Sequence, residues 1–240
     1  MTCHDVGRLR ALVPLWDGPR KANPVCDVEC RDEGMLAGLD EYIKAHPKGD
    51  ILIVLHQMGN HGPAYYKRYP KEFEKFTPVC RSNQLQECSR EEIVNAYDNT
   101  LLYTDHVLSQ VISLLKKHDD TFETAMFYMS DHGELLGDHG LLFKGCRFFE
   151  GLVHVPLIVS WPRSLLEGTV SRALVELVDV APTLLELSGI PIPDSMQGRS
   201  LAALLQGRGD VDTHKRVVVS EYNDAMAGGT TWATRGVSDG

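Results

Sequence analysis

Three short apolar runs alternate with helical patterns along the chain. Residues 51–55 (Ile-Leu-Ile-Val-Leu) form the first run, residues 125–129 the second and residues 155–159 the third. Continuous apolar runs of this length are typical of strands buried on both faces of a parallel sheet. We therefore expect three strands, with Pro156 near the start of the last one.

An amphipathic helix is predicted between the first two runs, from Ser89 to about residue 117. Ser89 and Glu92 have the spacing of a capping box, and basic residues near position 117 suit the C-terminal end of the helix dipole. Residues at spacings of three and four form one stripe, which we expect to face the sheet. The stripe consists of Ile93, Tyr97, Leu101, Thr104, Leu108, Val111 and Leu115.

A second helix is predicted over residues 178–187, with Asp179 near its start and Gly189 just past its end. Strands and helices that alternate with connections of this length imply right-handed crossovers in a sheet covered by helices. The predicted fold class is therefore α/β. No linker divides the 240 residues, so we expect one domain, with a polar, glycine-bearing and poorly ordered tail over residues 207–240.

Charge and hydropathy exclude two classes of partner. The chain carries 24 Lys and Arg against 33 Asp and Glu, a net charge of -9, which argues against a nucleic-acid-binding surface. Its longest apolar run has five residues, whereas a helix needs about 20 to cross a bilayer. The N-terminal residues also lack the apolar core of a secretory signal, so we expect no signal and no transmembrane anchor in this chain.

Four of the six cysteines form two close pairs, Cys26 with Cys30 and Cys80 with Cys88. Both pairs lie in polar, turn-rich segments, which favours two short disulfide loops formed in an oxidising compartment. Zinc ligation by the same four cysteines is the alternative, although neither pair has the two-residue gap of a zinc knuckle.

Asp131 and His132 directly follow the second apolar run, within residues 130–134 (Ser-Asp-His-Gly-Glu). Ligands of open α/β sheets collect at the carboxyl ends of strands, so this carboxylate and this imidazole are well placed for a metal ion. Zinc accepts such a mixture of hard oxygen and borderline nitrogen. The alternative is a helix N-cap in which Asp131 only satisfies backbone amides.

Two histidines follow the first apolar run, in residues 56–63 (His-Gln-Met-Gly-Asn-His-Gly-Pro). The glycines let the backbone approach a ligand, so the motif suits recognition of an anionic oxygen or ligation of a second metal. The alternative is a glycine-rich turn whose histidines face water. Two such motifs after neighbouring strands favour one shared site, whereas His118 and His214 are expected at the surface.

Lys144 lies in a third polar stretch, residues 137–145. Its ammonium group suits a position beside a tetrahedral oxyanion. The alternative is a solvated side chain, since it is one of 24 basic residues.

From about residue 24 to residue 134 the sequence resembles the catalytic domain of the lipid A phosphoethanolamine transferases. This group of the alkaline phosphatase superfamily includes the mobile colistin-resistance enzymes, so the resemblance implies a role in polymyxin resistance. The matching segments are residues 30–40 (Cys-Arg-Asp-Glu-Gly-Met-Leu-Ala-Gly-Leu-Asp), 55–63, 76–80 and 95–100.

From about residue 133 onward the likeness shifts to sulfatases of the arylsulfatase and choline-sulfatase type. The matching segments are residues 137–144, 149–151, 155–159, 179–185 and 198–201. The chain thus looks like a hybrid, with a transferase-like part over residues 1–134 and a sulfatase-like part over residues 135–206. In the transferases a histidine stands where this chain has Lys144.

The resemblance implies an alkaline-phosphatase/sulfatase-like mixed sheet flanked by helices, with the N-terminal part of that fold missing. In the transferases a zinc ion, held by upstream acidic residues, a threonine and the Asp-His pair, activates the threonine. The threonine takes phosphoethanolamine from phosphatidylethanolamine and passes it to lipid A at the periplasmic face of the inner membrane.

By position, the transferase resemblance makes Asp131 and His132 zinc ligands and places His61 against phosphoethanolamine or a second zinc. In the sulfatase interpretation, Asp131 and His132 stay at the metal, which is then calcium, and Lys144 grips a sulfate ester.

The catalytic nucleophile is not found in these 240 residues. In the transferases it lies upstream of the region that matches Cys3, and no cysteine here begins the sulfatase motif of Cys or Ser, any residue, Pro or Ala, any residue, Arg. We therefore expect weak zinc binding and little or no turnover by this chain alone. Three functions follow: phosphoethanolamine transfer, sulfate ester hydrolysis, and a catalytically dead anion-binding module.

Overall fold

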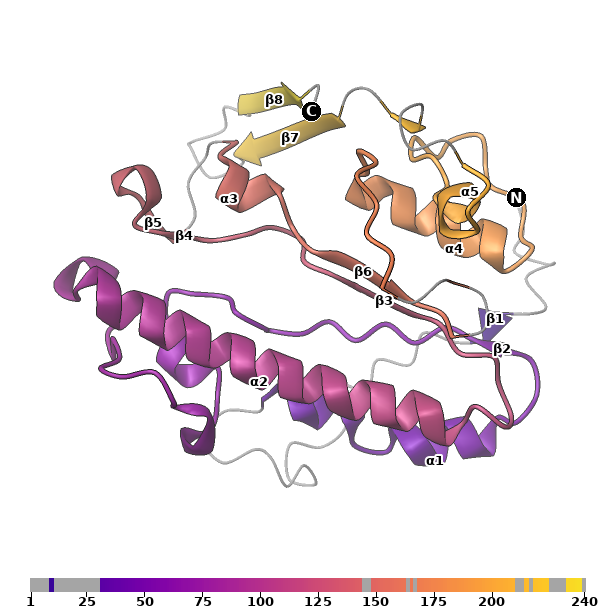
Figure 1. Ribbon diagram of the computed structural model, residues 1–240, viewed down its shortest axis with the longest axis horizontal. Coiled ribbons are helices and arrows are strands. Elements are labelled where there is room, and N and C mark those ends of the chain that lie inside the picture. The colour runs from indigo at the N-terminus through magenta and orange to yellow at the C-terminus, as the bar shows by residue number, and fades with distance from the viewer. Residues whose placement is uncertain are drawn as a thin grey trace. The chain divides into compact units, whose positions relative to one another are not determined.

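The computed structural model describes residues 9–10, 31–143, 148–162, 165, 168–209, 214–215, 218–224 and 232–238. Two compact units make up the chain, residues 1–124 with 136–143 and residues 125–135 with 144–240. In chain order (Figure 1) the elements are β1 (Leu9–Arg10), α1 (Leu39–Ala45), β2 (Asp50–Ile51), α2 (Arg90–Lys117), β3 (Met126–Met129), β4 (Leu135–Leu136), β5 (Leu142–Phe143), α3 (Glu150–Val153), β6 (Leu157–Ser160), α4 (Val180–Leu187), α5 (Ala202–Leu205), β7 (Val218–Asp224) and β8 (Trp232–Ser238).

The long helix α2 organises the first unit. Its start confirms the predicted capping box, because the Ser89 side chain accepts from the Glu92 amide while the Glu92 carboxylate accepts from the Ser89 amide. The predicted stripe is partly wrong, since Leu101 is exposed. The buried face is instead formed by Ile93, Ala96, Asn99, Thr100, Tyr103, Thr104 and Val107.

Polar side chains on this buried face hold the loops that precede the helix. Asn99 is fully buried, and its amide oxygen accepts hydrogen bonds from the backbone N–H groups of Lys75 (2.8 Å) and Phe76 (2.9 Å). Its amide nitrogen donates to the Phe76 carbonyl at 2.8 Å. Residues 75 and 76 lie in no helix or strand, so the Asn99 side chain supplies the hydrogen-bond partners that their backbone groups would otherwise lack.

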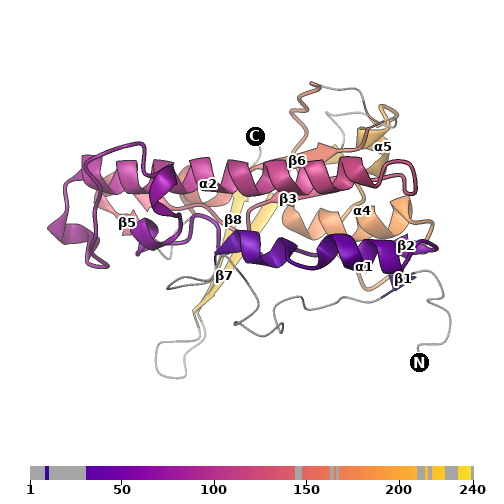
Figure 2. The ribbon, with the colours of Figure 1, turned by 90° about the horizontal axis from the view of Figure 1, so that it is seen from below.

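The C-terminal end of α2 is tied to α1, which lies alongside it (Figure 2). Asp40 of α1 accepts from Lys117 at 2.6 Å and lies 2.9 Å from the imidazole of His118. Hydrogen bonds from Lys117 and Lys44 hold the pKa of Asp40 well below its usual range. The expectation that His118 lies at the surface is wrong, because this pairing places it in a buried position.

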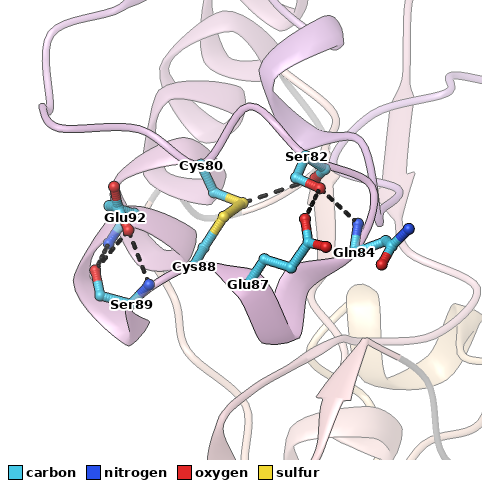
Figure 3. The surroundings of a disulfide bond; sticks show 7 residues. All are labelled: Cys80, Ser82, Gln84, Glu87, Cys88, Ser89 and Glu92. Atoms are coloured by element: carbon cyan, nitrogen blue, oxygen red, sulfur yellow. Dashed lines mark hydrogen bonds between the residues drawn. A yellow bond between two sulfur atoms is a disulfide. The ribbon is translucent and has the colours of Figure 1, made fainter.

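Cys80 and Cys88 form a disulfide just before α2 (Figure 3), as their spacing predicts. Both sulfurs lie in or against an apolar cluster with Tyr65, Leu85 and Ile93. The other predicted pair, Cys26 with Cys30, lies outside the described residues.

The first predicted strand is shorter than expected. Only Asp50 and Ile51 are in β2, which pairs in parallel with β1. Residues 52–55 continue without strand pairing, and Val54 is exposed. The prediction of a strand buried on both faces is therefore wrong for this run. Among the described residues, no helix combines the length and apolar character needed to cross a bilayer.

The second unit contains the other two predicted strands. β3 and β6 pair along their whole length, with Met126 opposite Ser160 and Met129 opposite Leu157. Their pairing is antiparallel, which corrects the expectation of parallel crossovers for these two strands. The fold retains the α/β character predicted from the sequence, with helices and small parallel and antiparallel strand pairs.

The predicted second helix is present as α4, with Gly189 in a left-handed conformation just past its end. Asp179, directly before it, is fully buried, and its carboxylate accepts from the amides of Glu176 (2.9 Å) and Arg199 (2.7 Å). The Lys215 ammonium lies 2.7 Å from the same carboxylate. Residues 179–185 and 198–201, both sulfatase-like segments, thus pack together around one buried charge.

His214 belongs to the same region and is also buried, so the expectation that it lies at the surface is wrong. Arg199 donates to the His214 carbonyl, and the imidazole Nε2 has no hydrogen-bond partner among the described residues. Burial lowers the pKa of His214 below its ordinary value, and the Arg199 charge lowers it further. Later in the stretch that we expected to be poorly ordered, β7 and β8 pair antiparallel.

The buried His214 predicts a pH-dependent stability. Its folded pKa lies below the unfolded value of about 6.5, so the unfolded state binds more protons and the free energy of unfolding falls as the pH drops below about 6.5. His214→Gln should flatten this decline in urea titrations at about pH 7.5 and about pH 5.5. The exposed His154 is the control, and an equal flattening by His154→Gln would contradict the assignment.

Candidate functional site

The Asp131–His132 pair lies in a tight turn directly after β3. The His132 amide donates to Asp131 Oδ1 at 3.1 Å, and the Ser130 hydroxyl donates to the His132 carbonyl at 2.7 Å. His132 Nε2 lies 3.7 Å from Asp131 Oδ2, with 32% of the His132 side chain and 78% of the Asp131 side chain exposed. The turn leads into β4 rather than a helix, so the N-cap interpretation of Asp131 is wrong.

A hydrogen bond of His132 fixes which ring nitrogen carries the proton. Nδ1 lies 3.0 Å from the Gly133 carbonyl oxygen, which only accepts, so Nδ1 is the donor. In the neutral ring Nε2 therefore keeps its lone pair and faces the Asp131 carboxylate. Metal-binding histidines usually have this arrangement, in which the second nitrogen donates to a carbonyl or carboxylate.

Gly133 holds the turn against α3. Its amide donates to the Leu152 carbonyl at 2.9 Å, and a Cβ atom at Gly133 would overlap the Gly151 carbonyl oxygen. The two backbones can approach so closely only because residue 133 has no side chain. The segment 149–151, which the sequence links to sulfatases, therefore supports the Asp131–His132 turn.

The loop that carries His61 is held by a buried carboxylate. Asp32 accepts hydrogen bonds from the amides of Met58 (2.9 Å) and Gly59 (2.8 Å), which lie 26 and 27 residues away in sequence. Burial raises the pKa of Asp32 above its ordinary value, while the two amide bonds and the nearby charges of Arg68 and His56 oppose that rise.

Two further contacts fix the loop from other directions. The Arg68 guanidinium donates to the His61 carbonyl at 2.7 Å, and the Asn60 amide group bonds to Thr100 on the buried face of α2. His61 Nδ1 lies 2.7 Å from the Gly62 carbonyl oxygen, so His61 and His132 share the same ring tautomer. The loop is not a loose glycine-rich turn, because three elements of the first unit anchor it.

Phe143 contacts the His61 ring edge to face, with ring centroids 5.7 Å apart. Its backbone is left-handed (φ +67°), an uncommon conformation for a bulky residue that is typical of strained functional segments. Phe143 ends β5 and packs with Leu136 and Leu142 on the apolar cluster of the first unit. The His61 loop and the stretch before Lys144 are therefore neighbours, while Lys144 itself lies outside the described residues.

The predicted residues thus fall into two groups. Asp131 and His132 lie together in the second unit, and His61 lies beside Phe143 in the first. Within the described part of the chain, no three His, Cys, Asp or Glu side chains gather closely enough to hold a metal ion. Sequence patterns missed Asp32, Gly133 and Phe143, although residues 30–40 had already been singled out as a transferase-like segment.

Comparison with known proteins identifies similar chains of two kinds. A family model described as Sulfatase matches residues 8–190. Phosphoethanolamine transferase EptA of Salmonella typhimurium is 48% identical over 136 residues, which are 55% of this chain and 25% of that protein. An arylsulfatase of Clostridium perfringens is 34% identical over 116 residues, 47% of this chain and 24% of that protein. The matched region is therefore about a quarter of either relative.

Solved structures give the same picture. The C-terminal periplasmic domain of phosphoethanolamine transferase EptC from Campylobacter jejuni is 45% identical, with a TM-score of 0.52 over 55% of this chain and 43% of that one. The phosphonate monoester hydrolase of Silicibacter pomeroyi covers 80% of this chain and 45% of its own with a TM-score of 0.62, but at 22% identity it shows the fold alone. The predicted alkaline-phosphatase/sulfatase-like fold is confirmed.

The close backbone contact at Gly133 predicts that this glycine cannot be replaced. Gly133→Ala should lower stability by about 2 kcal/mol or more, because the added Cβ meets a backbone oxygen that cannot move away independently. Thermal unfolding measures the loss, and hydrogen exchange at the Gly133 turn shows whether it is local. Gly151→Ala is the matched control, since its Cβ would make only ordinary contact with Leu135. Equal tolerance of both changes would contradict the proposed packing.

The Asp32 carboxylate predicts a loss of order in the His61 loop when one of its oxygens is replaced. Asp32→Asn places an NH₂ group against one of two backbone N–H donors, which should cost about 1–3 kcal/mol of stability. Amide exchange at Met58 and Gly59 should accelerate. Asp138→Asn is the control, because its ion pair with Arg90 is exposed and should contribute at most about 1 kcal/mol. Unchanged exchange at residues 58 and 59 would show that the carboxylate does not hold the loop.

Proposed function

This chain belongs to the sulfatase family, and we propose that it acts in its phosphoethanolamine-transferase branch, moving phosphoethanolamine from phosphatidylethanolamine to lipid A. The observation that carries the proposal is the 48% identity to EptA over 136 residues, which are 55% of this chain. An identity of 45% to the EptC periplasmic domain supports the same branch.

We propose that Asp131 and His132 hold a zinc ion. Their donor atoms suit zinc, since a carboxylate oxygen and an Nε2 with a fixed tautomer lie 3.7 Å apart. Two ligands of a tetrahedral zinc at about 2.0–2.1 Å are separated by roughly 3.4 Å, so a small side-chain rotation is enough. When bound, the zinc supplies Lewis-acid stabilisation of negative charge on the phosphoryl group.

His61 is proposed to contact the phosphoethanolamine group, or a second zinc, through Nε2. Its Nδ1 bonds to the Gly62 carbonyl oxygen and its backbone carbonyl accepts from Arg68, which together orient the ring, and Nε2 is the atom proposed for this contact. The protonated ring donates from Nε2 to a phosphoryl oxygen, whereas the neutral ring offers a lone pair to a metal. Lys144 is proposed to place a positive charge beside a tetrahedral oxyanion.

A sulfatase-like hydrolysis of sulfate esters is the second candidate. The observation that favours it is the support of the Asp131–His132 turn by the sulfatase-like segment at Gly151, together with 34% identity to an arylsulfatase. In that case calcium replaces zinc and Lys144 binds the sulfate ester.

The proposed location is the periplasmic face of the inner membrane. The structurally similar EptC domain is periplasmic, and the Cys80–Cys88 disulfide fits an oxidising compartment.

Ligand binding distinguishes the two functions and does not require turnover. Zinc-loaded chain, titrated with phosphoethanolamine and with an aryl sulfate by calorimetry, should bind phosphoethanolamine at least tenfold more tightly. His61→Ala should weaken phosphoethanolamine binding about tenfold while zinc stays bound, because one charge-assisted hydrogen bond is lost. His132→Ala should weaken zinc binding at least about tenfold, measured by titrating the chain with zinc, because one of the two proposed ligands is lost.

Matched histidines in each unit provide the controls. His46→Ala in the first unit and His154→Ala in the second should leave both ligands bound, since these histidines bond to the Tyr42 carbonyl and the Glu150 carboxylate. Preference for the aryl sulfate, with its hydrolysis in calcium, would replace the transferase function by the sulfatase one. Zinc retention unaffected by His132→Ala would overturn the metal assignment.

A further inference from the structure

Residues 67–81 form a segment whose charge is opposite to that of the chain. The segment contains five Lys and Arg residues against two Glu, while the whole chain has a net charge of -9. It follows the His61 loop directly and belongs to the same unit. Tyr69 and Phe73 point inward, where they pack with Tyr103 and Val107 of α2.

One of the two Glu residues of this segment, Glu74, is covered by cations, while Glu72 is exposed. Glu74 pairs with both Lys71 and Arg81, and only 5% of its side chain is exposed. The side chains of the two cations are 78% and 53% exposed. The exposed charged residues of the segment are Lys67, Lys71, Lys75 and Arg81 against Glu72, so its surface is positive.

The same segment carries an exposed aromatic side chain on a backbone that hydrogen bonds hold in place. Phe76 is 43% exposed, although its backbone N–H and carbonyl are both bonded to the buried amide of Asn99. Asn95 of α2 also donates to the carbonyl of Pro78 at 2.9 Å. An exposed phenyl ring on a backbone fixed in this way loses little conformational entropy when it enters an apolar phase.

We propose that residues 67–81 dock the domain on an anionic lipid surface, with Phe76 entering the interface and Lys71, Lys75 and Arg81 facing the headgroups. Aromatic and basic side chains together are the combination that binds such surfaces. An acidic protein partner would bind the cations alone and would not require an exposed phenyl ring on a fixed backbone. This inference deepens the proposed function, since it names the surface on which the lipid substrate would be met.

The position of the segment connects docking to the candidate site. Arg68, at its start, donates to the His61 carbonyl, and Tyr65 packs against Gly62 of the same loop. A lipid surface bound by residues 71–81 would therefore lie on the part of the first unit that carries His61.

Flotation with lipid vesicles tests the docking directly. The 240-residue chain should bind vesicles of phosphatidylcholine with phosphatidylglycerol, bind pure phosphatidylcholine vesicles far less, and be released at about 1 M salt, where the Debye length is about 3 Å. The double variant Lys75→Glu and Phe76→Ser should reduce the bound fraction at least tenfold, since each cation near an anionic surface contributes about fivefold. Asn99 bonds to the backbone of both positions, so the clamp survives these changes.

A matched double variant on α2 is the control. Leu101 is 45% exposed and Lys116 is exposed, so Lys116→Glu with Leu101→Ser changes charge and hydropathy equally at another place on the same unit. This control should bind vesicles like the unmodified chain. Equal losses in both double variants, equal binding to neutral vesicles, or no vesicle binding by the unmodified chain would each overturn the docking proposal.

The two proposals fail in different experiments. Soluble phosphoethanolamine needs no membrane, so the Lys75→Glu and Phe76→Ser variant should bind it like the unmodified chain. Vesicle docking without phosphoethanolamine binding would refute the transferase function and leave the docking surface standing. Phosphoethanolamine binding without vesicle docking would do the reverse.

Discussion

Hydrogen bonds between buried polar side chains and the backbone of the loops hold the first unit together. Asp32 binds the amides of Met58 and Gly59, and Asn99 binds the backbone of Lys75 and Phe76. Residues 52–88 contain only short 3₁₀ turns, so their backbone groups depend on such partners. A buried donor left without a partner costs about 1–3 kcal/mol, so these side chains determine where the His61 loop can lie.

In the second unit, close backbone contacts at glycines and one buried carboxylate hold the irregular segments in place. Gly133 meets the Gly151 carbonyl, and Gly198 comes equally close to the Val178 carbonyl. The Asp179 carboxylate accepts from the amides of Glu176 and Arg199 and pairs with the Lys215 ammonium, so it joins the segment before α4 to the segment at Arg199. The glycines of the Asp-His-Gly and Gly-Arg-Ser motifs are thus packing requirements. Gly133 fixes the turn on which Asp131 is exposed and His132 is half-buried.

Local patterns predicted what depends on local interactions. The capping box and the 3.6-residue period located α2, and the apolar runs located β3 and β6. The direction in which β3 and β6 pair depends on how the chain returns between them, so the apolar pattern could not supply it. The run at residues 51–55 looked like a strand, but only its first residue finds a partner among the described residues.

Site residues that lie in short polar motifs could be predicted from the sequence. Residues whose role depends on a hydrogen-bond partner far away in the sequence could not. His61, Asp131 and His132 could be named from their motifs, whereas Asp32 is 26 residues from its partner Met58 and Asp40 is 78 residues from His118. No local pattern reports such pairs. His118 and His214 were misjudged for the same reason, because their burial is set by Asp40 and Arg199.

The central proposal is that the Asp131 carboxylate and His132 Nε2 hold one metal ion. Cobalt(II) in place of zinc shifts the NMR signals of an imidazole that binds it, so histidine ring spectra of the cobalt-loaded chain test the proposal most directly. We expect a paramagnetic shift at His132 and none at His46, whose ring bonds to the Tyr42 carbonyl. A His132 ring signal that stays unshifted when cobalt is added would contradict the proposal.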